Sequence, residues 1–193
     1  MKSISRLRLV ILLLPTLLLL PRIDAIFSAT MPRKALGESL LLLLCGWAIS
    51  RLCPWQRMTS HASSAVLAAT LLFLFWMIPR SIDLTQIYPS ANALYVVSLF
   101  AVGFLLSHYW PMLPGVARVA YGLYFSSMIV AFGLLYAAQS TLLCSAYTLE
   151  EQHAFGWMLV PLGLGVYLLV LAFMTRWLVK PIESQLGSPP SAR

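Results

Sequence analysis

Charged residues are scarce in this sequence, and their scarcity restricts the class of protein. Asp, Glu, Lys and Arg make up 10% of the 193 residues, whereas a typical soluble domain has about 25%. Hydrophobic residues make up 60%, and the mean hydropathy is +0.85. A chain with so few charges cannot cover a water-facing surface, so a soluble globular domain is excluded and an integral membrane protein is indicated.

Cysteine and histidine are also scarce, at three residues each. Three cysteines do not make a disulfide framework, and Cys45 and Cys53 lie eight residues apart on one expected helix, too distant to bridge. The sequence has no Cys-x-x-Cys, His-x-x-x-His or Met-x-x-Met pair, no phosphate-binding loop and no dinucleotide fingerprint. We therefore expect no catalytic residues and no enzyme activity. Copper is the one cofactor that stays a candidate.

Long apolar runs dominate what is present. There are six of them, at residues 9–28, 36–53, 61–80, 91–110, 116–138 and 153–179. Each is long enough to cross about 30 Å of hydrocarbon as a helix, and their leucine-rich composition favours helices over barrel strands. We predict an all-α polytopic membrane bundle of about six transmembrane helices. Residues 1–28 would be a signal-anchor or signal-peptide helix, 29–180 the bundle and 181–193 a disordered cytoplasmic tail.

The charges sort to opposite sides of this expected bundle. If the N-terminus lies inside, nine of the thirteen Lys and Arg residues are cytoplasmic, as the positive-inside rule requires. Five of the six acids then lie outside: Asp24, Glu38, Asp83, Glu150 and Glu151. This indicates a multi-pass protein of the plasma (inner) membrane with both termini in the cytoplasm. The bases form no continuous stripe, so membrane lipids, and not nucleic acid, are the expected partners.

Polar residues gather where the runs end on the outer side. The expected outer-face polar cluster consists of Glu38, Asp83, Asn92, Glu150, Glu151 and Gln152. Three further residues there, Met77, Cys144 and His153, are of types that suit copper, with Met and Cys favouring Cu(I). An alternative interpretation of Glu150 and Glu151 is a helix N-terminus, where acids are favoured. No Asp or Glu lies deep in a run, which argues against a proton pump or a transporter of charged substrates.

The segment that opens the last run resembles the CtaG-like membrane proteins. Residues 150–161, EEQHAFGWMLVP, are similar to the Asp-Gln-Gln-x-Ala-Gly-x-x-Met-Trp-x-Pro run of that family. Residues 76–83 are similar to its Trp-His-x-Pro-x-x-Tyr-Asp segment. The resemblance spans about residues 36–180 and is most specific in the last run. CtaG-like proteins assist copper insertion during cytochrome c oxidase assembly, so the resemblance implies a helical membrane protein that acts in that process.

The sequence departs from the family at the family's histidines. Met77 stands in place of one histidine, and Asn92, Tyr95 and Val96 stand in place of the His, Glu and His of the next helix. If the family's histidines bind copper, most of that site is lost here. The resemblance with these departures implies a non-catalytic accessory subunit or assembly factor of a respiratory haem–copper oxidase. Its partners would be integral membrane subunits of the respiratory complex.

Two alternatives stay open. The first is an outer-face Cu(I)-binding chaperone that uses Met77, His153 and Cys144 as ligands. The second is a small membrane transporter, in which helices broken near Pro161 and Gly163 would surround a site at mid-membrane.

Overall fold

The computed structural model describes residues 15–52 and 61–186, with side chains up to Arg176. All of the secondary structure in these ranges is helical, which confirms the predicted all-α class. The elements are α2 (Pro21–Ser28), the π-helical turn η1 (Arg33–Glu38), α3 (Ser39–Leu52), α4 (Ala62–Met77), α5 (Pro79–Ile87), α6 (Pro89–Tyr109), the 3-10 turn η3 (Trp110–Met112), α7 (Gly115–Ala138) and α8 (Leu149–Leu186).

Prolines determine where several helices begin. Pro21, Pro79 and Pro89 each occupy the first turn of a helix, and the residue before each has an extended backbone. This is the expected pattern, because proline suits a helix N-terminus and disfavours helical geometry in the residue before it. At Pro79 the chain bends by 73° between α4 and α5. The third apolar run, 61–80, is therefore α4 with the beginning of a second helix, α5, that continues at an angle to Ile87.

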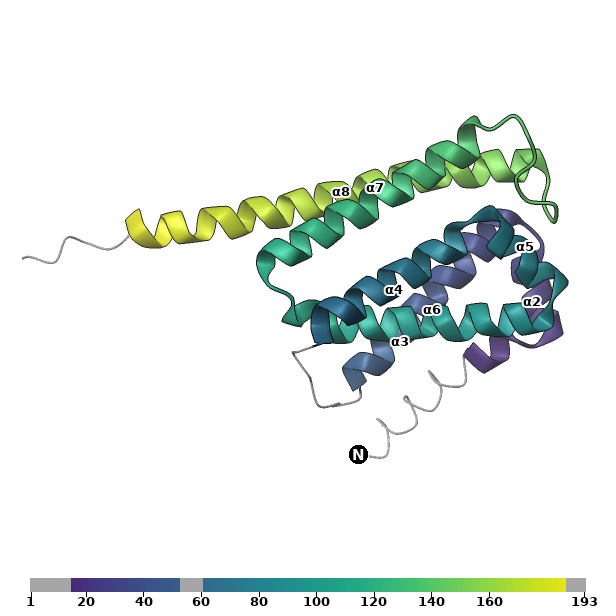
Figure 1. The fold of residues 1–193 in the computed structure, drawn as a ribbon, viewed down its shortest axis with the longest axis horizontal. Coiled ribbons are helices and arrows are strands. Elements are labelled where there is room, and N and C mark those ends of the chain that lie inside the picture. The colour runs from purple at the N-terminus through teal and green to yellow at the C-terminus, as the bar shows by residue number, and fades with distance from the viewer. Residues whose placement is uncertain (1–14, 53–60, 187–193) are drawn as a thin grey trace, which may run out of the picture.

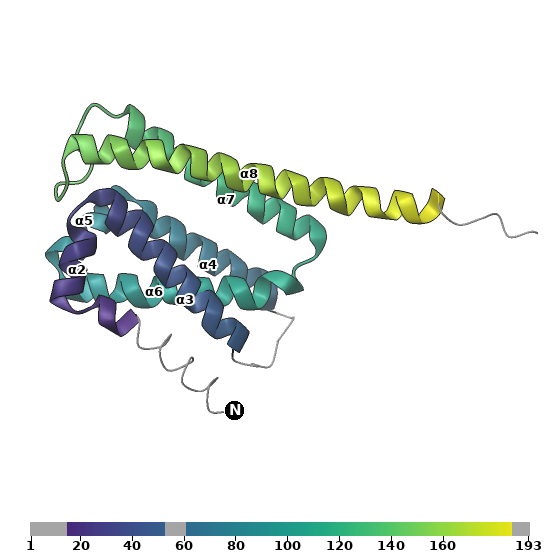
Figure 2. The same cartoon turned by 180° about the vertical axis from the view of Figure 1, so that it is seen from behind.

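The helices form two packed groups. The helices α3, α4 and α6 make a three-helix bundle that α2 and α5 cover at one end, and α7 and α8 pair as a long hairpin beside it (Figures 1 and 2). Glycines allow the closest crossing. A Cβ on Gly46 of α3 would collide with the Phe100 carbonyl oxygen of α6, and one on Gly103 would collide with the Leu43 carbonyl oxygen. Small residues bring membrane helices together in this way.

Within the described ranges, four helices are long and apolar enough to cross a membrane. They are Arg33–Leu52, Pro89–Met112, Gly115–Ala138 and Leu149–Arg176, and the bent pair of α4 and α5 would make a fifth. These correspond to the last five predicted runs. The first run, 9–28, begins outside the described residues, and its described part is interrupted between Leu20 and Pro21. The helix α8 continues to Leu186, beyond the boundary expected at residue 180, and residues 187–193 lie outside the described part.

The polar candidates meet at one end of the molecule. We call this the polar end: α2, α5, the beginnings of η1 and α6, and the segment 139–148 that joins α7 to α8 (Figures 1 and 2). Its parts are linked by side-chain contacts, such as those from Asp83 of α5 to Ser145 and from Gln86 of α5 to Ser28 of α2. The convergence expected from the sequence is therefore present.

Candidate functional site: a buried ion network at the polar end

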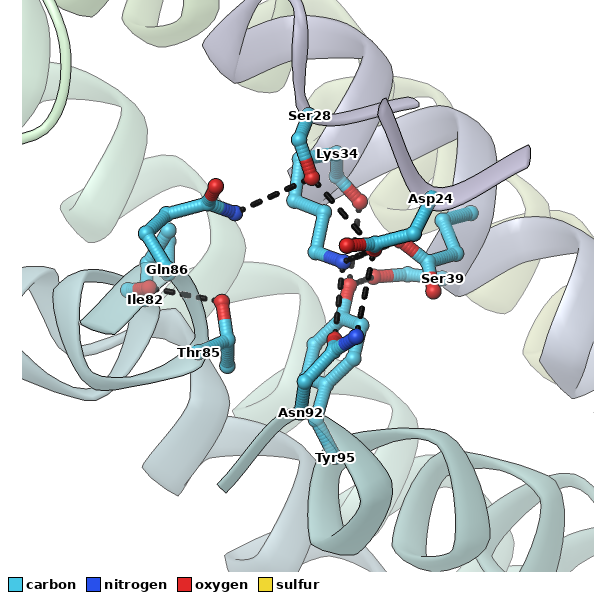
Figure 3. A network of polar contacts seen from close by, with 10 residues as sticks. Asp24, Ser28, Lys34, Ser39, Ile82, Thr85, Gln86, Asn92 and Tyr95 are labelled. Carbon is cyan, nitrogen blue, oxygen red and sulfur yellow. Dashed lines mark hydrogen bonds and ion pairs between the residues drawn. The ribbon is translucent and has the colours of Figure 1, made fainter. Parts of the chain in front are cut away.

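A buried lysine is the centre of the polar end. Lys34 lies in η1 with 1% of its surface exposed. Its Nζ lies 2.7 Å from Asp24 Oδ1, 2.8 Å from Glu38 Oε2 and 2.8 Å from Asn92 Oδ1 (Figure 3). The ammonium donates hydrogen bonds to Asp24 and Asn92, and the Glu38 carboxylate compensates its charge as an ion pair. Burying such a charge is tolerated only when it is compensated in this way.

The π-helical turn that carries Lys34 is held by a tyrosine from α6. Tyr95 donates its hydroxyl hydrogen to the Lys34 carbonyl at 3.0 Å, and its oxygen lies 2.7 Å from Ser39 Oγ. Because the single tyrosine hydrogen goes to Lys34, Ser39 must be the donor in the second contact. The Lys34 Nζ also lies 5.4 Å from the centre of the Tyr95 ring, within the range of a cation–π interaction.

The network extends to two more helices. Asn92 of α6 donates to Asp24 Oδ1 at 3.1 Å, so its amide bridges Asp24 and Lys34. Ser28 Oγ donates weakly to Asp24 at 3.4 Å and accepts from Gln86 of α5 at 3.2 Å (Figure 3). One connected set of contacts thus joins α2, η1, α5 and α6.

The network is not fully balanced. Two carboxylates, Asp24 and Glu38, face one ammonium. Glu38 is completely buried, its Oε1 has no hydrogen-bond partner, and its Oε2 contacts Lys34 as an ion pair without hydrogen-bond geometry. The hydroxyl of Tyr147, in the segment 139–148, is also buried without a hydrogen-bond partner. Burial, and then the charges of Cys144, Glu151, Glu38 and Asp24, raise the pKa of Tyr147, so the phenol stays protonated.

The predicted outer-face polar cluster divides into two parts. Glu38 and Asn92 belong to the network around Lys34, whereas Asp83, Glu151 and Gln152 bind the segment 139–148. The Asp83 carboxylate accepts hydrogen bonds from the backbone N–H groups of Ser145 at 2.8 Å and Ala146 at 3.2 Å. Gln152 is fully buried and binds the backbone of Leu143 and Thr141.

The two glutamates that open α8 lie in a helix N-terminus. Glu151 accepts the Thr148 backbone N–H at 3.1 Å, and its own N–H donates to Thr148 Oγ1 at 3.3 Å. This reciprocal pair is a capping box. Glu150 lies in the same first turn with an exposed side chain. The alternative interpretation of these acids as helix-terminal residues is therefore confirmed.

Of the three residues predicted for copper, two have another hydrogen-bond partner and the third is buried. The His153 ring lies 2.8 Å from the Gln139 carbonyl, the Cys144 thiol donates to the Pro79 carbonyl at 3.5 Å, and the Met77 side chain is buried. Burial and the nearby Asp83 charge raise the pKa of Cys144 to about 12, so at neutral pH it is a thiol and not the thiolate that metals prefer. Across residues 15–52 and 61–176, no three His, Cys, Asp or Glu side chains form a metal-binding group.

Sequence reasoning missed the two residues that organise the network. Lys34 and Asp24 were counted only among the charges on the outer side of the membrane, which the positive-inside rule uses to set topology. Lys34 and Glu38 are four residues apart at the beginning of a run. This spacing could have indicated an ion pair, because such residues lie on one helix face. The spacing does not show that the two side chains are buried.

Comparison with family models, curated proteins and solved structures finds no match for this chain. The fold and the network define the class of protein: an all-α integral membrane bundle whose polar end is held together by a buried, compensated lysine.

Proposed function

We propose that the protein is a non-catalytic accessory subunit or assembly factor of a respiratory haem–copper oxidase. It acts in the plasma membrane with both termini in the cytoplasm, and it acts without a bound metal. One observation carries the choice of a scaffold over a copper donor. Asn92 and Tyr95 stand where the CtaG-like resemblance has His and Glu, and here both side chains bind the buried Lys34.

The chemistry of this network disfavours a metal at the same place. The Lys34 ammonium already occupies the position between two carboxylates and an amide oxygen. A copper ion beside it would be repelled by the ammonium, and repulsion between like charges is strong in a medium of low dielectric constant. An internal cation therefore gives the cluster a structural role, which is the role of a scaffold.

The segment that carries the family resemblance is also structural. Within residues 150–161, Glu151 caps α8, Gln152 holds the preceding segment, and Gly156 packs on the backbone of Ala137 in α7. None of these contacts needs a ligand. The similarity to CtaG-like proteins in this segment thus supports a shared hairpin shape, and through it a shared place in oxidase assembly.

Removal of the gene tests the proposal. We expect a deletion strain to contain less assembled oxidase, measured by the haem spectrum of its membranes. Normal oxidase content in the deletion strain would contradict the proposal. A mild-detergent pull-down of the tagged protein from native membranes distinguishes the two roles, because stoichiometric oxidase subunits indicate an accessory subunit and trace amounts an assembly factor.

Complementation distinguishes the scaffold from the Cu(I) chaperone. We expect the triple variant Met77→Ala, Cys144→Ser, His153→Ala to restore oxidase content as the wild type does, provided that it accumulates to the same level in membranes. Failure of the variant, together with Cu(I) binding by the wild type in equilibrium dialysis, would instead support the chaperone.

A further inference from the structure

A narrow apolar cleft lies between the two helix groups, away from the polar end. It has a volume of about 380 Å³ and is lined by residues of α3, α4, α6 and α7. Representative lining residues are Leu40, Leu44, Phe73, Leu106 and Phe125. Among the lining residues that the structure describes, Arg51 is the only charged one.

Arg51 stands at the end of this cleft with its charge available. Its guanidinium carbon lies 5.6 Å from the centre of the Trp47 ring, and in the described part of the chain it forms no ion pair with a carboxylate. Trp110 lines the same end. Arginine and tryptophan are the residue types that sit at the level of lipid headgroups, and a guanidinium binds phosphate well because its donors match phosphate oxygens.

The length of the cleft matches one leaflet of a bilayer. Leu40 and Arg51 both line it and are eleven residues apart on one helix, which corresponds to about 16 Å at the α-helical rise. Half of the hydrocarbon thickness is about 15 Å. An acyl chain that starts at a phosphate on Arg51 would therefore reach the far end of the cleft near mid-membrane.

The lining favours a phospholipid, because its phosphate supplies an anionic partner for Arg51 and its acyl chain matches the apolar walls of the cleft. We propose that this cleft is a binding site for an anionic phospholipid, with the phosphate on Arg51 and an acyl chain between α3, α6 and α7. The site is independent of the proposed role in oxidase assembly.

A second cleft provides a comparison. It is lined by Trp110, Arg118, Val166, Leu169, Val170 and Phe173. There the guanidinium already has hydrogen-bond partners within the protein: Arg118 donates to the backbone carbonyls of Leu113 at 2.8 Å and Pro111 at 2.7 Å. A guanidinium held by two carbonyls has less capacity for a phosphate, so we assign the lipid to the first cleft.

Native mass spectrometry of the full-length protein in detergent tests the headgroup contact. We expect phosphatidylglycerol to bind more tightly than phosphatidylcholine with the same acyl chains. Arg51→Leu should weaken phosphatidylglycerol binding about fivefold, as expected for one basic residue near an anionic surface, and should remove the preference over phosphatidylcholine. Arg51→Lys should keep most of the preference. Arg176→Leu removes an equal charge from an exposed position on α8 and should leave binding unchanged.

A blocking variant tests the acyl-chain contact with Arg51 intact. Leu44→Trp places a large ring in the cleft from a position that is 63% exposed, so it should fold normally and weaken binding of both lipids. Leu168→Trp, at a 65% exposed position on α8, is the matched control. Unchanged phosphatidylglycerol binding in Arg51→Leu, or in Leu44→Trp, would overturn the site. Photocrosslinking from position 44 to another polypeptide, and not to lipid, would also overturn it.

Discussion

At the scale of single residues, Lys34 has the greatest effect on the structure. It is almost fully buried, and its three polar partners come from α2, η1 and α6. A buried ion pair adds little net stability compared with apolar residues, because removing both charges from water is costly. Its value here is in specificity: only one docking of α2 on the bundle brings Asp24 to the ammonium.

Replacing Lys34 should destabilise the protein strongly. In Lys34→Met the Glu38 carboxylate stays buried without a counter-charge, and we expect a loss of about 3 kcal/mol in the free energy of unfolding, at the low end for a broken buried pair because Asp24 is partly exposed. Unfolding by SDS in mixed micelles measures it. Arg33→Met removes the same charge from an exposed neighbour and should have little effect.

Removing the whole set of charges should restore part of that stability. The triple variant Asp24→Asn, Lys34→Met, Glu38→Gln leaves no buried charge, and it should be more stable than Lys34→Met alone. A triple variant as unstable as Lys34→Met would mean that the lost hydrogen bonds of the ammonium, and not the uncompensated Glu38 carboxylate, cause the instability.

Cys144 should be unreactive over a wide pH range. Its pKa, raised to about 12 from 9.0, lowers the thiolate fraction at pH 8 by roughly a factor of 1,000. In a Cys45→Ser, Cys53→Ser background, iodoacetamide should label the folded protein far more slowly than the SDS-unfolded protein. Because the folded state holds this proton more tightly, its contribution to stability is present below pH 9 and is lost as the pH rises towards 12. Equal labelling rates in both states would contradict this description.

At the scale of elements, glycines and prolines determine how helices meet and where they begin. The crossing of α3 and α6 depends on Gly46 and Gly103, which leave no room for a Cβ. By contrast, a Cβ on Gly165 of α8 would meet nothing within 4 Å. The same residue type is therefore essential in one helix and replaceable in another.

This contrast is testable with two alanine substitutions. Gly46→Ala should cost about 1–3 kcal/mol, because the new methyl group must push the backbones of α3 and α6 apart. Gly165→Ala should be neutral or slightly stabilising, because alanine is the better helix former. The SDS unfolding midpoints of both variants give the comparison. Equal midpoints would show that the crossing tolerates a wider helix separation.

Helix positions were predictable from sequence, and helix contacts were not. Four of the runs predicted from hydropathy correspond closely to α3, α6, α7 and α8. The bend at Pro79 was not predicted, because a run of apolar residues does not show the direction of a helix. Of the site, Glu38 and Asn92 were identified, whereas Lys34 was not, because its burial depends on α2 folding back over η1.

At the scale of the whole molecule, charge is distributed between two ends. The acids Asp24, Glu38 and Asp83 lie at the polar end together with the bases Arg22, Arg33, Lys34 and Arg80, whereas Arg51 and Arg118 lie at the opposite end beyond the apolar helix bodies. The orientation with the polar end outside stays a proposal that rests on the bases of the full sequence, nine of thirteen of which were assigned to the other side.

Fusion reporters test this orientation. Green fluorescent protein at the C-terminus should fluoresce, and alkaline phosphatase at the same point should be inactive, because that end is proposed to be cytoplasmic. Alkaline phosphatase fused after Ser140, in the segment between α7 and α8, should be active. The reverse pattern would mean that the polar end faces the cytoplasm, and the lipid proposed at Arg51 would then lie in the outer leaflet.

The amino-acid sequence by itself determined the properties that depend on neighbouring residues: membrane class, helical state and most helix limits. These follow from hydropathy, proline geometry and the cost of moving charges across lipid. Only the tertiary structure decided which helix faces meet. Asn92 lies 68 residues from Asp24, and the cleft beside Arg51 draws on four helices. Such groupings depend on side-chain packing between distant segments, and no local pattern of residues encodes them.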